Sequence, residues 1–373
     1  MKSVLYIMHV PWGIIKQRPH FIAEELSSMY KVDVLHRVQH FNKKQLVTEV
    51  VKRNDNISFY EYDILPFDKI PIINCIKTTF INKLLLKRRI PCNKKYDAVW
   101  ITSPYSYWYF KDLIPKDIPL YYDCMDDLSE FPELSKKRKE LIIRSEGLLL
   151  KRANHVFFSA EYLKNKIIQR YNYCGKYTIV NNAIEPPTSD NGYIPPKDIK
   201  EKIDYIKGLN NPIVYIGTIA LWFDFDNVIA LLESNKDISV VLIGPSSIEI
   251  PKHDRLCALG TVPRDSIFGI MDAAKALIMP FKVNELIKSV NPVKLYEYIY
   301  SGKPVVASRY NETEKFLPYV SLYNEKSELI NIISDILNSE VSNISREQRE
   351  AFVLNNTWHS RALQIDEAIS KQE

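Results

Sequence analysis

Three acidic residues stand within five positions at the end of a strand-like run in YYDCMDDLSEF, residues 121–131. A carboxylate in such a place can take the proton from a hydroxyl group as that group attacks another molecule. Acids this close together also raise one another's pKa, which suits a base that works near neutral pH. We predict Asp126 as the general base, Asp127 as the second candidate and Asp123 as a structural acid. The alternative for Asp127 is an N-cap, because Glu130 follows it three residues later, as in a capping box.

A second group of polar residues lies in SVNPVKLYEYIYSGKPVVAS, residues 289–308. Asn291 suits the N-cap of a helix, and Pro292 suits the first helical position, where a missing N–H costs nothing. The helix is expected to run to about residue 301, because Gly302 suits the position after a helix and Pro304 prevents its continuation. The residues that follow, PVVAS, read as a buried parallel strand.

The amino end of this helix predicts an anion site. Free backbone N–H groups and the positive end of the helix dipole favour an anion, and Lys294 adds a full charge, so a diphosphate would fit. Glu297 lies one turn further along the same face and can accept hydroxyl hydrogens from a ribose. The alternative is that Lys294 and Glu297 form only an i,i+3 salt bridge. The N–H groups that we expect at the site belong to Ser289, Val290, Asn291, Val293 and Lys294.

The elements around these residues alternate between strands and helices in both halves of the chain. Such alternation predicts parallel sheets covered on both faces. A proline-rich stretch, EPPTSDNGYIPP at residues 185–196, is the best linker candidate. We therefore expect an α/β protein of two Rossmann-like domains facing across a cleft, with residues 1–186 and 187–345 as the domains. Residues 346–373 are expected to form C-terminal helices that cross back to the first domain. The strand-like runs are VLYIMHV, KVDVLH, ISFYEYD, YDAVWITS, IPLYYDC, HVFFSA and YTIVNN, then PIVYIGT, ISVVLIGP, CALGTV, AKALIMPF, KPVVAS and YVSLY.

The run IMPFKVNELIKSVNPVKLYEYIYSGKPVVAS resembles the donor-binding segment of GT-B glycosyltransferases. Within that fold it is similar to the group (family 4, or group 1) of teichuronic-acid and other bacterial cell-surface polysaccharide transferases. Further stretches match in order along almost the whole chain, among them YIGTIALWFDFDNV, ALGTVPRDSIFGIMDAA and HVPWGIIKQRPHFIAEELS. The NPxKLYEYxxxGKPVV run is the specific signal, whereas each of the other stretches is weak alone.

The resemblance implies roles for individual residues in the second half. Glu297 would bind the ribose, and Lys294 with the amides of residues 289–291 would bind the diphosphate. Gly217 and Thr218 would let the diphosphate approach a turn, and the backbone around Val262 would contact the base. Many retaining members carry a further Glu eight residues before the ribose-binding one, but Ser289 stands there in this chain. The basic residues that often follow the first glycine loop are missing too, which leaves Lys294, Lys282 or Lys288 to neutralise the diphosphate and leaves the stereochemistry open.

The loop PWGIIKQRPH, residues 11–20, would face the cleft in this fold. Trp12 could stack on a sugar, and Gln17 and Arg18 could bind acceptor hydroxyls or phosphate. The alternatives are that Trp12 is a core residue and that Arg18 simply opens the next helix. We expect no metal and no cofactor, because the only Asp-x-Asp, at residues 224–226, reads as the start of a helix.

Charge is unevenly distributed along the chain. Residues 1–185 hold 30 lysines and arginines against 20 acidic residues, whereas residues 186–373 hold 20 against 25. A basic first half favours an anionic partner. The stretch IINCIKTTFINKLLLKRRI, residues 72–90, and KKRK at 136–139 suit a contact with an anionic membrane. The alternative is an ordinary solvated helix. No nucleic-acid-binding module is recognisable, so nucleic acid is not an expected partner.

Together these features predict a metal-independent glycosyltransferase that uses a nucleotide-diphosphate sugar, a UDP-sugar in particular. Its acceptor would be a saccharide, lipid-linked if the membrane contact holds, in the synthesis of a capsule, an exopolysaccharide or O-antigen. Five scattered cysteines and a short first apolar run favour the cytoplasm, and the membrane contact, if it holds, would place the protein at the inner face of the plasma membrane. The alternatives are a nucleotide-sugar epimerase of the same fold and a non-catalytic protein that binds sugar nucleotides or glycans.

Overall fold

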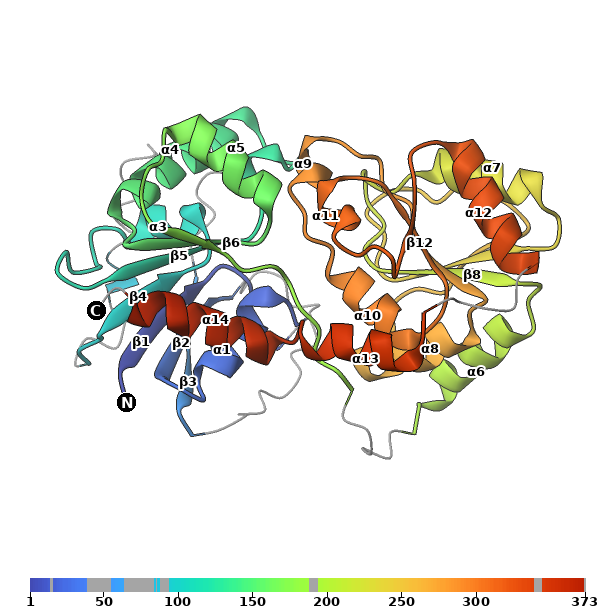
Figure 1. Cartoon of the computed structure of the whole chain (residues 1–373). Helices are drawn as coiled ribbons and strands as arrows, with labels where there is room; N and C mark the ends of the chain where they lie inside the picture. Colours follow the sequence, from blue (N-terminus) through green and yellow to red (C-terminus); the bar gives the residue numbers. More distant parts are fainter. Residues whose placement is uncertain are drawn as a thin grey trace. The chain divides into compact units, whose positions relative to one another are not determined.

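The computed structural model describes residues 1–13, 16–38, 55–63, 84, 86–87, 94–187, 194–338 and 344–371. The chain divides into two compact units, each an α/β layered structure (Figure 1). Unit 1 comprises residues 1–181 and 358–373, and unit 2 comprises residues 182–357. The sequence placed the divide at residues 186 and 187. It also grouped residues 346–373 with unit 1, whereas in the structure the chain returns to that unit at Trp358.

Unit 1 is built on a parallel sheet of seven strands in the order β3-β2-β1-β4-β5-β6-β7. Its strands are β1 (Ser3–Met8), β2 (Lys31–Arg37), β3 (Ile57–Tyr62), β4 (Ala98–Ile101), β5 (Leu120–Cys124), β6 (His155–Phe158) and β7 (Tyr177–Ile179). Its helices are α1 (Arg18–Leu26), α3 (Pro104–Phe110), α4 (Lys136–Arg152), α5 (Glu161–Tyr171) and α14 (Trp358–Ser370), with a 3₁₀ turn, η2 (Leu128–Glu130).

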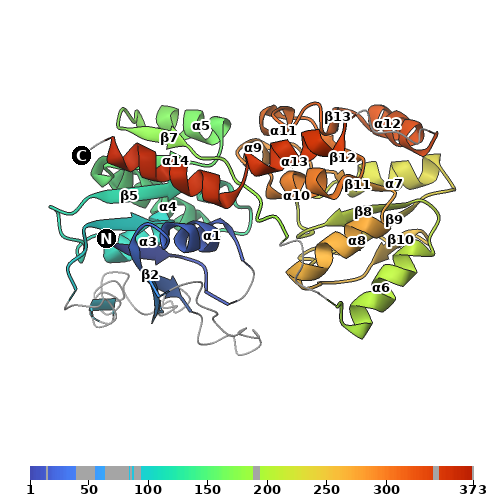
Figure 2. The ribbon, with the colours of Figure 1, turned by 60° about the horizontal axis from the view of Figure 1, so that its bottom comes forward.

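The helices of unit 1 cover both faces of its sheet (Figures 1 and 2). Alternate strand residues supply the two cores, since successive side chains of a strand point to opposite faces. Leu5 and Ile7 of β1 join the apolar cluster that includes residues of α3, α4 and α5. Tyr6 and Trp100 stack on the other face with ring centroids 5.9 Å apart. Phe21 of α1 stacks on Trp358 of α14, which ties the C-terminal helix to this unit.

Unit 2 repeats this plan with six parallel strands in the order β10-β9-β8-β11-β12-β13. Its strands are β8 (Pro212–Ile216), β9 (Ser239–Ile243), β10 (Leu256–Ala258), β11 (Ala276–Met279), β12 (Val305–Ser308) and β13 (Ser321–Tyr323). Its helices are α6 (Lys197–Lys207), α7 (Phe225–Ser234), α8 (Ile267–Ala273), α9 (Glu285–Lys288), α10 (Val293–Ser301), α11 (Asn311–Glu314), α12 (Lys326–Asn338) and α13 (Arg346–Leu354), with a 3₁₀ turn, η3 (Arg264–Ser266).

The strand order reverses between β8 and β11 in unit 2, and between β1 and β4 in unit 1. In open parallel sheets, the crevice outside the carboxyl ends of the strands at such a point is the usual ligand site. Each strand-like run named from the sequence corresponds to one strand of the two sheets, so the expected α/β architecture is confirmed.

Candidate functional site

Glycine turns follow three strands at the carboxyl edge of the sheet in unit 2. The N–H of Gly217, which follows β8, donates to the carbonyl of Ile243 at 2.7 Å. The N–H of Gly244, which follows β9, donates to the carbonyl of Gly260 at 2.8 Å. A Cβ atom added to Gly217 would lie 2.0 Å from Cε of Lys294, so only glycine leaves room for that side chain. The backbone of this turn is therefore approached closely by the lysine of α10.

Residues of helix α10 itself fix the helix at this edge of the sheet. The helix ends at Gly302, whose φ of 77° is the left-handed conformation that glycine adopts without strain. The hydroxyl of Tyr298 accepts from the N–H of Ile216 at 2.8 Å, which ties α10 to the end of β8. Since α10 precedes the parallel strand β12, its amino end lies at the carboxyl edge of the sheet, as the sequence predicted. Lys294, one turn before Tyr298, is thereby brought against Gly217.

The prediction that Asn291 is the N-cap is wrong. The helix begins at Val293, and Pro292 occupies the cap position. The side chain of Asn291 is buried and acts as a hub instead. It accepts the backbone N–H of Asn182 at 3.0 Å and donates to Glu312 at 2.9 Å. A side chain that makes tertiary hydrogen bonds of this kind stabilises the start of α10 from outside the helix.

Four of the five amides expected at the amino end divide into two groups. Those of Ser289 and Val290 donate to the carbonyls of Leu286 and Ile287, at 3.0 Å each, because the short helix α9 ends there. Those of Val293 and Lys294 donate to no carbonyl within the described residues, as is usual in the first turn of a helix. Of these four amides, those of residues 293 and 294 are therefore the ones left to meet an anion, and the anion site itself stays a prediction.

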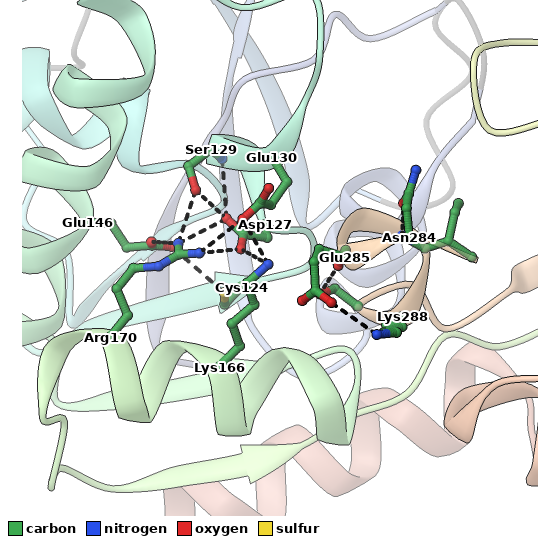
Figure 3. A network of polar contacts seen from close by, with 12 residues as sticks. Cys124, Asp127, Ser129, Glu130, Glu146, Lys166, Arg170, Asn284, Glu285 and Lys288 are labelled. Atoms are coloured by element: carbon green, nitrogen blue, oxygen red, sulfur yellow. Dashed lines mark hydrogen bonds and ion pairs between the residues drawn. The ribbon is translucent and has the colours of Figure 1, made fainter. Parts of the chain in front are cut away.

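Of the three candidate basic residues, Lys294 is the one that lies beside the glycine turn at Gly217. Burial lowers the pKa of Lys294, while the nearby Glu297 carboxylate raises it. The two side chains do not form the i,i+3 salt bridge that was the alternative interpretation; the carboxylate of Glu297 pairs with Arg264, at 3.1 Å, instead. The other two candidate bases are engaged, Lys282 with Asp226 at 3.5 Å and Lys288 with Glu285 at 3.0 Å. Figure 3 shows the latter pair.

Two other residues predicted to contact a nucleotide lie at the same edge of unit 2. Thr218 is exposed directly after Gly217, and its carbonyl accepts the hydroxyl of Tyr215 at 2.8 Å. Val262 is half-buried in the loop that follows β10 and packs against the core of the unit. The structure therefore gathers the predicted residues of the second half on one unit, although their contacts with a nucleotide stay a prediction.

In unit 1 the three acids after β5 have three different environments. Asp123 is fully buried and accepts Nε and Nη2 of Arg18 at 3.0 and 2.8 Å. Nη1 of Arg18 donates to the carbonyl of Val180 at 2.7 Å. The guanidinium thus joins α1 to β5 and to the segment after β7. These contacts favour the structural interpretation of Arg18 over the prediction that it binds an acceptor.

Asp127 belongs to a buried polar network (Figure 3). Its carboxylate accepts both terminal nitrogens of Arg170, at 3.0 and 2.6 Å, and the hydroxyl of Ser129 at 2.6 Å. Lys166 adds an ion pair at 3.2 Å. Burial alone would raise the pKa of Asp127, but the hydrogen bonds from Arg170 and Ser129 outweigh it and hold the pKa below its usual value. Asp127 also caps η2 through the N–H of Ser129, so the N-cap interpretation fits its contacts.

Asp126 is the acid that no such network holds. It is partly exposed, and its carboxyl group makes no hydrogen bond or ion pair with the described residues. Burial raises the pKa of Asp126 to about 7, and the neighbouring Asp123 and Asp127 carboxylates add to the effect, against an opposing contribution from Arg18. A carboxyl group with this pKa changes protonation state near neutral pH, which is what a general base requires.

The loop after β1 is mostly packed inside unit 1. Trp12 is buried against Phe59 and His20, with ring centroids 4.5 and 4.9 Å apart, which favours its interpretation as a core residue. Gln17 is exposed just before α1, and its backbone N–H donates to Nδ1 of His20 at 3.1 Å. Of the three residues predicted to bind an acceptor, Gln17 is the one that solvent reaches freely.

Other predictions have simpler outcomes. Asp224 caps α7 by accepting the N–H of Asn227 at 3.2 Å, which confirms the helix-start interpretation of the Asp-x-Asp.

The membrane segment at residues 72–90 lies outside the described residues apart from 84, 86 and 87. The KKRK run forms the first turn of α4. Among the helices that the structure describes, none has the length and apolarity needed to cross a membrane.

Arg264 is the residue that the sequence reasoning missed. It opens η3, directly after the loop that follows β10, and its guanidinium reaches both Glu297 and, at 3.9 Å, Glu185. The sequence signal was weak, because Glu297 lies on α10 and is separated from Arg264 by α8, β11 and α9. The spacing of 33 residues between Arg264 and Glu297 hides the pair until the fold is known.

Comparisons with known proteins agree on the fold. No protein-family model matches the chain. TuaH of Bacillus subtilis strain 168, named as a candidate teichuronic acid biosynthesis glycosyltransferase, is 24% identical over 265 residues. That match spans 65% of this chain and 65% of the relative, slightly under two thirds of its length. The resemblance to this group of transferases is thus found by sequence comparison as well as in the motifs.

Solved structures match over the full chain. Sucrose-phosphate synthase of Thermosynechococcus elongatus has a TM-score of 0.70 at 14% identity, with 100% of this chain and 99% of that chain covered. HepE of Anabaena, crystallised with UDP and glucose, has a TM-score of 0.69 at 14% identity, with coverage of 99% and 100%. Trehalose-6-phosphate synthase of Burkholderia multivorans has a TM-score of 0.69 at 10% identity, with coverage of 100% and 99%. The chain has the GT-B fold.

Proposed function

We propose that the protein is a glycosyltransferase that moves a sugar from a UDP-sugar to a saccharide acceptor. The observation that carries the proposal is Lys294, which lies against the glycine turn at Gly217 without an ion pair among the described residues, with Glu297 one turn further on. A full-length GT-B fold, shared with a structure that holds UDP, supports it. Fold alone does not determine function, so the argument rests on this site.

The donor would bind at unit 2 by charge and by close approach. The amides of Val293 and Lys294, the dipole of α10 and the ammonium group of Lys294 would hold the pyrophosphate. Gly217 lacks the side chain that would keep an anion away from its backbone. Glu297 would accept the two ribose hydroxyls, and the backbone around Val262 would contact the base. These groups would stabilise the charge that develops on the departing diphosphate in the transition state.

Asp126 would act as the general base on the acceptor hydroxyl. Its raised pKa and its lack of a competing ion pair support this assignment over Asp127, whose oxygens are held by Arg170 and Ser129. We also propose that no divalent metal takes part, because Lys294 and the helix amides supply the positive charge that a metal would otherwise bring. Activity that persists in EDTA would support this part of the proposal.

The acceptor is proposed to be a lipid-linked saccharide in the synthesis of a cell-surface polysaccharide. The similarity to TuaH supports the polysaccharide part of this proposal, and the excess of basic residues in the first half of the chain supports a contact with the anionic membrane that would carry the lipid. Attraction to an anionic membrane is worth about 1 kcal/mol for each basic residue near the surface. Co-sedimentation with vesicles that contain phosphatidylglycerol, compared with vesicles of phosphatidylcholine alone, tests the contact.

A screen of nucleotides tests the main proposal. Unfolding temperatures should rise with UDP more than with GDP or ADP, since a ligand that binds only the folded state stabilises it. UDP-sugars that stabilise the protein should then be consumed only when a saccharide acceptor is present. Isomerisation of the sugar without an acceptor would instead indicate an epimerase. UDP binding with no turnover, and with unchanged behaviour in Asp126→Asn, would indicate a binding protein.

A further inference from the structure

The proposed ribose subsite includes an arginine, Arg264, that lies outside the helix motif at residues 289–308. The carboxylate of Glu297 is buried, with 8% of the side chain exposed, and its Oε1 accepts no hydrogen bond from the described residues. Its one recorded ionic partner is Arg264, whose Nη2 lies 3.1 Å from Oε1. A buried carboxylate with a cation beside it and unused acceptor capacity is unusual, because such oxygens are normally hydrogen-bonded.

The arginine holds this carboxylate from outside the helix. Arg264 belongs to η3, and its side chain is 35% exposed, so the guanidinium bridges solvent and the buried acid. A second carboxylate, that of Glu185, lies 3.9 Å from its Nε and also attracts the guanidinium. Among the described residues, Arg264 is the basic residue that forms an ion pair with this buried carboxylate. Its contact with Oε1 also restricts the rotamer of the glutamate.

We propose that Arg264 is a positioning residue of the ribose subsite, which holds the Glu297 carboxylate turned toward two neighbouring hydroxyl groups. The inference rests on the proposed function, since it takes a nucleoside diphosphate as the ligand. Ionised oxygens accept stronger hydrogen bonds than neutral ones. Two vicinal hydroxyls require both oxygens in one fixed plane. A ribose therefore binds more tightly to this arrangement than a 2′-deoxyribose does. Arg264 is expected to increase that difference in affinity.

The experiment compares the affinity of UDP with that of 2′-deoxy-UDP by calorimetric titration. The wild-type protein should bind UDP about tenfold or more tightly than 2′-deoxy-UDP, the size of one charge-assisted hydrogen bond. In Arg264→Gln the ratio should fall to about twofold. Glu297→Gln should show the same low ratio, and the double variant should fall no further, because the two residues act through one contact. Arg309→Gln, which removes a surface arginine paired with Glu314, is the matched control and should keep the wild-type ratio.

The outcomes separate this inference from the proposed function. Failure of the wild type to bind UDP overturns both. Wild-type binding of UDP with an unchanged ratio in Arg264→Gln overturns the positioning role alone. An equal loss of affinity for both nucleotides also overturns it, because that result would mean that Arg264 contacts the phosphates. Thermal unfolding of each variant without nucleotide establishes that it is folded. Arg264→Lys keeps the positive charge on a shorter side chain, so its affinity ratio is expected to lie between those of the wild type and Arg264→Gln.

Discussion

Replacement of Asp126 by asparagine should make the protein more stable above neutral pH and much less active. Asparagine has nearly the same size as aspartate, but it does not ionise. The carboxyl group of Asp126 lies among other acids and makes no ion pair with the described residues, so its negative charge is unfavourable in the folded state. A general base in such a place would be an example of function maintained against stability.

The magnitude follows from the pKa. Burial raises the pKa of Asp126 from 3.8 to about 7, which is about three units at 1.36 kcal/mol each, or about 4 kcal/mol. Partial exposure reduces this value, and we expect about 2 to 4 kcal/mol. The folded state binds the proton more tightly than the unfolded state, so the favourable contribution is complete below pH 3.8 and is lost as pH rises through about 7. The gain in Asp126→Asn should accordingly be full at pH 8 and absent near pH 3.5.

Urea unfolding at pH 8 and pH 4, for the wild type and the variant, measures the change in free energy. Transfer rates on a UDP-sugar and its acceptor should fall by about 10² to 10⁴ in the variant, the usual contribution of a general base. The wild-type rate should rise with pH through about 7, as Asp126 loses its proton, and the variant should lack that rise. Asp127→Asn is the control with the opposite sign, because it removes the buried carboxylate that pairs with Arg170 at 2.6 Å and with Lys166 at 3.2 Å, and it should destabilise by about 3 kcal/mol.

The reasoning would be refuted by a variant that is equally stable relative to the wild type at both pH values and transfers sugar at the wild-type rate. A loss of stability at pH 8 in Asp126→Asn would be equally contrary, since it would mean that the carboxylate has a favourable partner. Parallel loss of stability in both aspartate variants would show that the acids after β5 act as one structural cluster.

Three further predictions concern unit 2 and the chemistry. Gly217→Ala should weaken UDP binding about tenfold or more in calorimetric titration, because its Cβ would lie 2.0 Å from Cε of Lys294 and force that side chain to move; binding at the wild-type level would show that the turn has room. Asn291→Ala should lower the free energy of unfolding by about 2 to 3 kcal/mol in urea, because the partners of its buried amide lose their hydrogen bonds; an unchanged midpoint would contradict the role of Asn291 as a hub. Dialysis against EDTA should leave the transfer rate unaltered, whereas a loss restored by Mg²⁺ or Mn²⁺ would disprove metal independence.

Much of the fold could be predicted because parallel strands carry a strong local signal. Buried strands read as short runs of Val, Ile, Tyr and Phe, and their alternation with helices leaves few possible topologies. The C-terminal end of α10 was equally predictable from local sequence, because Gly302 and Pro304 act on the backbone of neighbouring residues. The amino end was not, because Asn291 has its partners at Asn182 and Glu312, far away in sequence.

The charged groups were harder to predict because their meaning depends on tertiary contacts. Arg18 and Asp123 are 105 residues apart and form one buried pair. The three acids after β5 look alike in sequence, yet Arg170 and Lys166 hold Asp127, Arg18 holds Asp123 and Asp126 is left to titrate. Spacing within a segment locates chemistry, whereas the partner that engages or frees each group comes from elsewhere in the chain.

The central claim is that the amino end of α10 binds the diphosphate of a nucleotide. Calorimetric titration of UDP into the wild type, Lys294→Glu, Glu297→Ala and the exposed control Lys326→Glu tests it most directly. We predict a loss of about 100-fold in affinity for Lys294→Glu, about tenfold for Glu297→Ala and none for Lys326→Glu. Wild-type affinity in both Lys294→Glu and Glu297→Ala would place the nucleotide elsewhere and contradict the account.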